Sequence, residues 1–393
     1  MHIYRLSNAL ARRGHTVDVI CDQDAYHVLH PDPPPGTFPN EPGVTLHALK
    51  SRAGFLSSLA TQQTGMPYFK RKKIQTILDT HPPDVTHFHN VSLIGGPGVL
   101  FMGCGVKIYT THEHWLVCPM HVLWKFNREA CEERDCMRCQ IQGKRPPQWW
   151  RYTRLLERAV KEIDLFLSPS RFTLERHLNW GGMKIPMREL PYYYNPPEGA
   201  EEVGAATVDT SGSVWPRRYF LFVGRLEKIK GVQNILPAFR KHTDADLLIA
   251  GEGDYGNELR SLAQGIENVH FLGRKNQAEL TALYREAVAL IVPSICYEVF
   301  GIIMIESFAH KTPVIAHHYG VLPEVVEQSG GGFTYKNEEE LIDAMRLLQS
   351  DPEQRRRLGE QGYDCYQRKW SEPAHLEEYL KIVEELLANK AAA

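Results

Sequence analysis

Short runs of apolar, often β-branched residues alternate with helical stretches along the whole chain, and this alternation limits the possible folds more than any other feature. Continuous apolar strands that are separated by helices are typical of parallel sheets with both faces covered. At 393 residues the chain is long enough for more than one such domain. We therefore predict an α/β protein of two doubly wound domains that face each other across a cleft. The expected strands lie at 16–20, 84–89, 107–111, 165–168, 219–223, 246–250, 269–272, 290–292 and 313–316.

The composition changes between the two halves of the chain. From 191 to 217, prolines and glycines stand among small and polar residues, which is typical of a linker. We expect an N-terminal domain over 1–190, the linker over 191–217 and a C-terminal domain over 218–368. A final helix is expected over 369–393, where the spacing of the apolar residues is helical.

The beginning of the sequence is unusual for a doubly wound domain. Ile3, Leu6 and Leu10 follow helical spacing and Gly14 is a helix stop, so Met1 already lies within an amphipathic helix. Such a domain usually starts with a strand and a glycine-rich turn before its first helix. We expect that first strand and turn to be missing from this sequence.

Composition disfavours several classes of partner and location. The 45 basic and 47 acidic residues leave a net charge of −2, so no strong positive field attracts nucleic acid. No apolar run approaches the length of about 20 residues that a membrane-spanning helix needs. The first residues lack the layout of a signal peptide, and eight cysteines are few for a disulfide scaffold of this length. These features favour a reducing, cytoplasmic setting.

A basic turn follows the expected strand at 219–223. Gly224 and Gly231 allow tight backbone turns, and Arg225 and Lys230 bring two cations to the carboxyl end of the strand. Ligands of open α/β sheets bind at this edge, and a diphosphate is well matched by one arginine and one lysine. Taken alone, the turn fits a solvated basic loop equally well.

A second motif lies at 289–310, where Glu298 follows a strand and Glu306 stands eight positions later in an apolar helix. The backbone N–H groups near Phe300, Gly301 and Ile302 are expected to be free at the helix start, where they form an anion site. Unpaired carboxylates are rarely buried, so a glutamate in such a helix favours a functional role. Glu306 is placed to accept the hydroxyls of a ribose, and Glu298 to reach a sugar hydroxyl.

Together, the basic turn and the two glutamates resemble the motifs of the retaining glycosyltransferases of family 4, which have a B-type fold of two Rossmann-like domains. In that family the last helix crosses back to the first domain. The resemblance covers nearly all of residues 219–330. It is supported by shorter phrases at 13–17, 83–89, 110–113, 250–253, 271–274, 293–294 and 320–324.

The resemblance implies roles for individual residues. Arg225 and Lys230 would hold the donor diphosphate, Glu306 the ribose and Glu298 the donor sugar, and His112 matches the family's histidine near that sugar. The implied catalytic residues are therefore Glu298, Arg225, Lys230 and His112. The implied donor-binding residues are Gly224, Arg225, Lys230, Gly251, Arg274 (beside the base), Phe300, Gly301, Ile302 and Glu306.

The resemblance also implies an activity. Family members transfer a sugar from a nucleotide-diphosphate sugar with retention of configuration, commonly without a metal ion, and the leaving diphosphate helps to remove the acceptor proton. A UDP- or GDP-linked donor and an unidentified glycan, lipid or small-molecule acceptor are expected, in glycan, polysaccharide or glycolipid synthesis. Two alternatives stay open: an incomplete transferase that only binds nucleotide, favoured by the missing first strand, and a nucleotide-sugar epimerase on the same scaffold.

Four cysteines form a further cluster in the sequence. Cys136 and Cys139 have the Cys-x-x-Cys spacing of half a zinc knuckle, and Cys118 and Cys131 complete a set of four thiols. The residues between them are too polar to pack as a core. The pattern therefore suggests a structural metal, preferably zinc rather than an iron–sulfur cluster, and the alternative is free or redox-sensitive thiols.

Two segments in the first half combine aromatic and basic residues, 68–73 and 149–152. Relatives that glycosylate lipids contact membranes through such patches, so peripheral membrane contact at the inner face is one interpretation. A solvated helix face with core tryptophans is the other, and the sequence favours it.

Overall fold

The computed structural model describes residues 2–29, 39–180, 182, 184–196 and 215–392. The chain divides into two compact units, unit 1 with Met1–Leu190 and Leu376–Ala393, and unit 2 with Pro191–His375. Most of the predicted linker, residues 197–214, lies outside the described residues. Each unit is described by itself.

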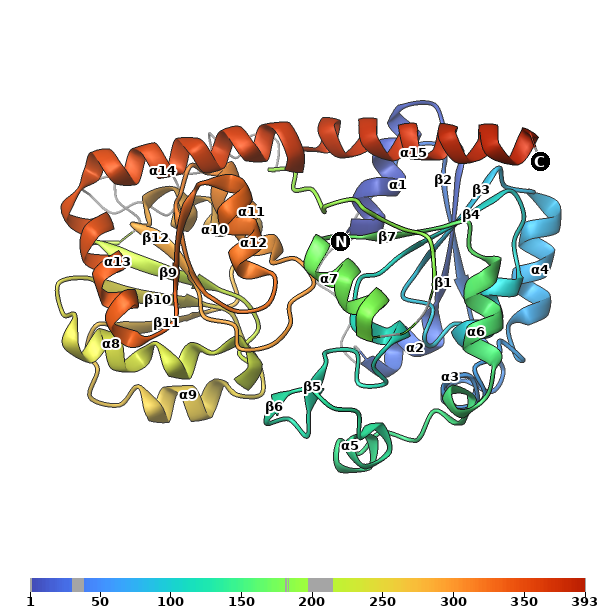
Figure 1. The fold of residues 1–393 in the computed structure, drawn as a ribbon, viewed down its shortest axis with the longest axis horizontal. Coiled ribbons are helices and arrows are strands. Elements are labelled where there is room, and N and C mark those ends of the chain that lie inside the picture. Colours follow the sequence, from blue (N-terminus) through green and yellow to red (C-terminus); the bar gives the residue numbers. More distant parts are fainter. Residues whose placement is uncertain (1, 30–38, 181, 183, 197–214, 393) are drawn as a thin grey trace. The chain divides into compact units, whose positions relative to one another are not determined.

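Unit 2 contains a six-stranded parallel sheet in the order β11-β10-β9-β12-β13-β14 (Figure 1). Numbered from the first strand of the unit, this order is 3-2-1-4-5-6, which is the doubly wound arrangement. The strand order reverses between β9 and β12. The strands are β9 (Tyr219–Val223), β10 (Asp246–Ala250), β11 (Val269–Gly273), β12 (Ala289–Val292), β13 (Val314–His317) and β14 (Gly332–Tyr335).

Helices pack against both faces of this sheet. The four central strands are buried along their whole length except for the last residue of β13, because each carries a continuous apolar run. Phe220, Phe239 and Met345 are among the fully buried residues of the core. The helices are α8 (Leu236–Lys241), α9 (Gly256–Leu262), α10 (Gln277–Glu286), α11 (Ile302–Ala309), α12 (Leu322–Ser329), α13 (Glu338–Ser350) and α14 (Pro352–Cys365).

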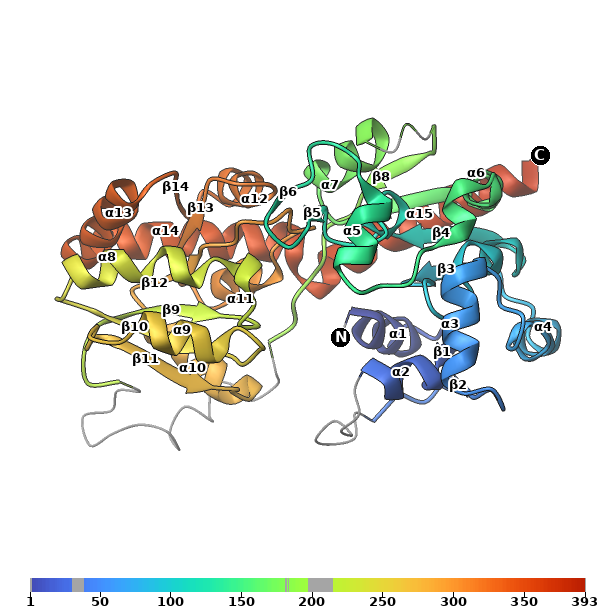
Figure 2. The same cartoon turned by 90° about the horizontal axis from the view of Figure 1, so that it is seen from below.

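Unit 1 has two separate parallel sheets in its described residues, β1-β2 and β3-β4-β7-β8, together with a small antiparallel hairpin, β5-β6. The helices α1 and α2 lie beside β1 and β2 (Figure 2). The strands are β1 (Val17–Asp22), β2 (Val44–Leu49), β3 (Val85–His89), β4 (Val106–Thr110), β5 (Trp124–Lys125), β6 (Glu129–Ala130), β7 (Leu165–Ser168) and β8 (Met187–Glu189). The helices are α1 (His2–Arg12), α2 (Gln23–Leu29), α3 (Phe55–Thr64), α4 (Arg71–Thr80), α5 (Cys136–Gln142), α6 (Leu155–Ala159) and α7 (Arg171–Glu175).

The last helix, α15 (Glu372–Ala392), contributes to the core of unit 1. Leu376, Tyr379 and Ile382 are buried with Leu6 of α1 and Ile108 of β4. The predicted α/β class, the parallel sheets and the C-terminal helix are confirmed. No helix in the described ranges is both long and apolar enough to span a bilayer.

Candidate functional site

The carboxyl ends of β9 and β12 carry the two predicted motifs of unit 2. These strands are neighbours at the point where the strand order reverses, and open α/β sheets bind ligands at this point. The loop after β9 holds Arg225 and Lys230, and the loop after β12 holds Glu298. Residues that are 68 positions apart in the sequence are therefore brought to one edge of the sheet.

Glycines allow these loops to pack backbone against backbone. Gly231 has a φ of +75°, and a Cβ at this position would lie 1.9 Å from the carbonyl oxygen of Pro293. A Cβ on Gly251, which follows β10, would lie 1.8 Å from the carbonyl oxygen of Gly224. Only glycine fits such approaches, so the two glycines hold the loops after β9, β10 and β12 against one another.

Lys230 and Glu298 form an ion pair at the centre of this edge. Lys230 Nζ lies 2.6 Å from Glu298 Oε1, and Ser294 Oγ donates a hydrogen bond of 2.8 Å to the same oxygen. About one fifth of each charged side chain is exposed. The carboxylate is thus held by two donors while both partners stay accessible from solvent.

Both partners of the pair are stabilised in their charged forms. Burial alone would raise the pKa of Glu298, but Lys230 and the hydrogen bonds from Lys230 and Ser294 hold it below its ordinary value. Burial alone would lower the pKa of Lys230, but Glu298 raises it above its ordinary value. The edge therefore carries a fixed negative and a fixed positive charge at neutral pH.

Arg225 adds a second cation to the same loop. Its guanidinium pairs with Glu227 at 2.8 Å, and three quarters of the side chain is exposed. Its charge also acts on Lys230 and Glu298. Arg225 therefore keeps donors available to an anionic ligand.

The loop that holds Glu298 leads directly into the N-terminus of α11. Gly301 precedes the helix with a φ of +90°, and no side chain caps this end. Phe300 is buried between the rings of Tyr192 and Trp370, which anchors the turn, and Ile302 is partly buried. The N–H groups of a helix's first turn attract anions.

The remaining predicted donor residues lie farther along the edge or deeper in the unit. Glu306 is half-buried in α11 and accepts a hydrogen bond of 3.2 Å from the hydroxyl of Tyr284 in α10. Arg274 is exposed after β11, and β10 lies between β11 and β9. The structure thus joins Glu298 to Lys230, whereas Glu306 and Arg274 each stand in a different setting.

His112 belongs to unit 1, just after β4. Its Nε2 lies 2.7 Å from Nδ1 of His89, at the end of the neighbouring strand β3. Burial lowers the pKa of His112 to about 4 and lowers the pKa of His89 well below its ordinary value. Both imidazoles are neutral at physiological pH, so this pair presents polar groups without charge.

Three residues that contact the predicted site residues were not assigned a role from the sequence: Ser294, His89 and Tyr284. Ser294 and His89 lie inside phrases that carry the family resemblance, so their positions at strand ends were the available signal. Tyr284 lies in a helix with no such signal. Its contact with Glu306 depends on how α10 and α11 pack.

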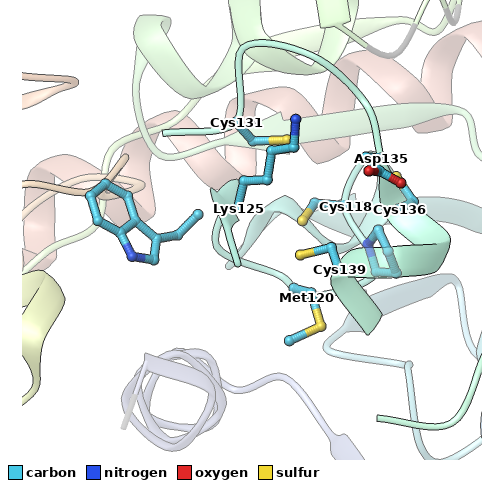
Figure 3. A pocket seen from close by; sticks show the side chains of 9 residues that line it. Cys118, Met120, Lys125, Cys131, Asp135, Cys136 and Cys139 are labelled. Atoms are coloured by element: carbon cyan, nitrogen blue, oxygen red, sulfur yellow. The ribbon is translucent and has the colours of Figure 1, made fainter. Parts of the chain in front are cut away.

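The four cysteines Cys118, Cys131, Cys136 and Cys139 line one small cavity in unit 1 (Figure 3). All four are free thiols. No three His, Cys, Asp or Glu side chains in the described part of the chain are already arranged to hold a metal ion. The metal prediction is therefore not confirmed, but the convergence of the four side chains on one cavity is a finding.

Most aromatic residues of the segments 68–73 and 149–152 are exposed, but of the two tryptophans expected in the core Trp150 is buried. Tyr68, Phe69, Trp149 and Tyr152 are between half and two thirds exposed. Lys70 is different, because it is buried and pairs with Asp22 and Asp24 at 2.9 and 3.1 Å. It is thus no part of an exposed basic patch, and membrane contact stays a prediction.

Two family models match the chain and together span most of it. The model described as Glycosyltransferase Family 4 matches residues 1–190, and the model described as Glycosyl transferases group 1 matches residues 210–364. An uncharacterized glycosyltransferase of Methanocaldococcus jannaschii is 36% identical over 121 residues, which are 29% of this chain and 31% of that protein. The first curated relatives are matched over only 31–44% of their own length.

Solved structures resemble the whole chain at lower identity. A sucrose-phosphate synthase from Thermosynechococcus elongatus has a TM-score of 0.73 and 19% identity, over 98% of this chain and 93% of that one. HepE of Anabaena in complex with UDP has a TM-score of 0.64 and 16% identity, over 87% and 86%. At these identities the likeness shows a shared fold. The matched family models and the shared fold agree, and the chain belongs to the group 1, family 4 glycosyltransferases.

Proposed function

We propose that this protein transfers a sugar from a nucleotide-diphosphate sugar to an acceptor, with retention of configuration and without a catalytic metal ion. The observation that carries the proposal is the Lys230–Glu298 ion pair beside Arg225 at the switch point of the unit 2 sheet. A departing diphosphate needs positive charge, and this edge supplies two cations. Residues in each unit match the family motifs, which is why transfer is favoured over binding alone.

The two cations would act on the leaving diphosphate. Lys230 is charged at neutral pH and is fixed by Glu298, while Arg225 is exposed and can fork two phosphate oxygens. The uncapped start of α11 offers further N–H donors. Preorganised charges of this kind stabilise a transition state because they need no rearrangement as the diphosphate departs.

Glu298 would support the sugar rather than attack it. Its carboxylate accepts hydrogen bonds from Lys230 and Ser294, so it is stabilised as an anion and weakened as a nucleophile. An anion at this position favours positive charge on the sugar ring and can accept a sugar hydroxyl. The acceptor proton would then pass to the departing diphosphate, and the product would keep the donor's anomeric configuration.

Glu306 would hold the ribose, and His112 would contact the donor sugar as a neutral imidazole. The hydroxyl of Tyr284 orients one carboxylate oxygen of Glu306, and the carboxylate can accept a hydroxyl of the ribose. A UDP-linked donor is favoured because a protein of the same fold, HepE of Anabaena, was solved with UDP. A GDP-linked donor is the alternative that the first experiment distinguishes.

The test is isothermal titration of the chain with UDP and with GDP. We expect binding of one of them, and a loss of about 1.5–3 kcal/mol in Glu306→Ala, as for a hydrogen bond to a charged group. The matched control is Glu327→Ala on the neighbouring helix α12, where the glutamate is exposed. Turnover of the corresponding nucleotide sugars follows, with NMR of the product anomer.

The outcomes separate the candidate functions. Nucleotide binding without release of nucleotide from any donor, across a panel of acceptors, would favour a binding protein. Conversion of the donor without acceptor would favour an epimerase. No binding of either nucleotide by the folded protein would overturn the proposed donor site.

A further inference from the structure

The segment that follows His112 in unit 1 is built as a small knuckle. The short hairpin β5-β6 leads into α5, and four cysteines flank these elements. Cys118 precedes β5 and Cys131 follows β6, while Cys136 and Cys139 lie in the first turn of α5. Residues three apart share a helix face, so the hairpin and the helix both direct thiols to one place.

The cavity between the cysteines has room for one small occupant. Its volume is about 20 Å³, and its lining includes all four cysteines (Figure 3). A water-sized occupant needs about this much space. Trp124 also lines the cavity, and its buried Nε1 has no hydrogen-bond partner in the described residues.

Backbone N–H groups are aimed at the sulfurs. The N–H of Phe126 donates to Cys139 Sγ at 3.5 Å. Burial raises the pKa of the Cys118 thiol, and hydrogen bonds from the backbone of Leu123, Met120 and His121 to its sulfur offset part of this effect. Donors of this kind orient the ligands of metal sites and support their charge.

The backbone of the knuckle is held in an uncommon conformation. Of the seven non-glycine residues with positive φ in the described chain, five lie here: His121, Leu123, Phe126, Asn127 and Lys144. Such conformations are costly and persist when surrounding contacts impose them. Residues 125–135 are mostly polar or charged and offer little apolar surface to impose them.

Lysine and arginine side chains lie near the thiols, and Asp135 lines the same cavity. Lys125 acts on Cys131, Arg134 on Cys136, and Arg151 on both Cys118 and Cys136. Arg151 is partly buried, donates to the carbonyl oxygens of Trp115 and Leu116, and forms no ion pair with a carboxylate among the described residues. Four thiolates around one divalent cation carry a net charge of −2, and Lys125, Arg134 and Arg151 would offset part of it.

We propose that Cys118, Cys131, Cys136 and Cys139 bind one zinc ion, which fixes the knuckle 118–145 beside His112. Zinc favours four-coordinate thiolate sites and a Cys-x-x-Cys pair. Each thiol releases its proton to solvent as its Zn–S bond forms, and no oxidation state changes. The sulfurs are not assembled in the structure, so the side chains must turn between staggered rotamers toward the cavity.

The first test is the metal content of the full chain, expressed with added zinc and purified anaerobically with a reductant. We expect about one zinc per chain, as for a structural Cys₄ site. Cys131→Ser and Cys136→Ser should retain less than about a tenth of it, because three thiols no longer close the coordination shell. The matched control is Cys104→Ser, an exposed cysteine of the same unit, which should retain all of it.

A second measurement uses the unaltered chain and does not depend on whether a variant folds. Exchange of zinc for cobalt(II) should give the visible bands of tetrahedral cobalt and the sulfur-to-cobalt charge-transfer band. Cys131→His should still bind cobalt, with weaker charge transfer. Removal of zinc by a chelator should make residues 118–145 sensitive to protease, and added zinc should restore protection.

Three results would each overturn the proposal. The first is a folded, reduced chain that takes up neither zinc nor cobalt. The second is a disulfide between two of the four cysteines in the freshly purified protein. The third is equal zinc content in Cys104→Ser and Cys136→Ser.

Discussion

The two units end their neighbouring parallel strands in opposite chemistry. In unit 2 the edge after β9 and β12 carries the ionised pair Lys230–Glu298. In unit 1 the edge after β3 and β4 carries the pair His89–His112, which burial keeps neutral. The topology of parallel strands is shared, so the difference comes from the side chains at the strand ends.

The difference in charge between the two edges suits two kinds of ligand, one anionic and one neutral. A nucleotide diphosphate is an anion and suits an edge with fixed cations. A sugar hydroxyl is neutral and suits donors and acceptors that add no charge. On the proposed function, the charged edge of unit 2 suits the diphosphate and the neutral edge of unit 1 suits a sugar hydroxyl.

The largest expected effect comes from removing the cation of the unit 2 pair. Lys230→Ala should lower the free energy of unfolding by about 3 kcal/mol, because the mostly buried carboxylate of Glu298 loses its cationic partner and keeps only the hydrogen bond from Ser294. Urea denaturation at pH 7 measures this. Lys228→Ala, which removes an exposed lysine from the same turn, should change it by less than about 0.5 kcal/mol.

The neutral pair of unit 1 sharpens this prediction. His112→Ala should cost about 1 kcal/mol, the value of one hydrogen bond between neutral groups. The double variant Lys230→Ala/Glu298→Gln also removes the negative charge of Glu298. It should therefore recover part of the free energy of unfolding that Lys230→Ala loses. Equal losses in Lys230→Ala and His112→Ala would contradict the contrast between the units.

The loop packing of unit 2 gives an intermediate effect. Gly231→Ala should cost about 2–3 kcal/mol, because its Cβ meets the Pro293 carbonyl oxygen in a backbone that cannot easily move. The control is Gly265→Ala, which has the same φ of +75° but nothing within 4 Å of the added Cβ. It should cost about 1 kcal/mol from the left-handed conformation alone. Thermal unfolding of the two variants isolates the contact, and equal costs would mean that the loops do not touch.

The last test concerns the pH dependence of the stability of unit 1. The pKa of His112 is lowered to about 4, so between pH 6.5 and 4 the unfolded chain binds a proton that the folded chain does not. Stability therefore falls as the pH falls through this window. His112→Gln should reduce the slope of the free energy of unfolding against pH by at most about 1.4 kcal/mol per pH unit.

Urea titrations at pH 7 and pH 5 measure this slope, with exposed His15→Gln as the control. Glu298 behaves differently because its pKa is lowered below the ordinary value of 4.5. Its contribution is present above that pH and is lost as the pH falls further. An unchanged slope in His112→Gln would mean that the imidazole is not kept neutral by burial.

The sequence predicted those elements whose signal is local. The nine expected strands are all present, because each carries apolar or β-branched residues that are buried or partly buried within a sheet. Five strands were not predicted. β2 alternates exposed and half-buried residues, β14 begins with Gly332, and β5, β6 and β8 have only two or three residues. Such strands depend on their partners rather than on their own sequence.

The candidate site likewise contains residues with a local sequence signal and residues whose contacts depend on tertiary packing. Lys230 and Glu298 were recognisable because charged residues directly follow strands, and the sheet brings those strand ends together. The hydrogen bond from Tyr284 to Glu306 and the contact between His89 and His112 arise from tertiary packing. Spacing in the sequence gives no measure of these distances. The burial of Lys70 is a similar case, because its partners Asp22 and Asp24 lie more than 45 positions away.

The membership of α15 in the core of unit 1 has a consequence for biosynthesis. Leu376, Tyr379 and Ile382 complete a core whose other members come from the first 190 residues. Residues 191–375 must therefore be translated before unit 1 can close. At about 5–20 residues per second this delay is roughly 10–40 s. During that time Leu6 and Ile108 lack their last apolar partners, so the core of unit 1 stays incomplete on the ribosome until α15 has been made.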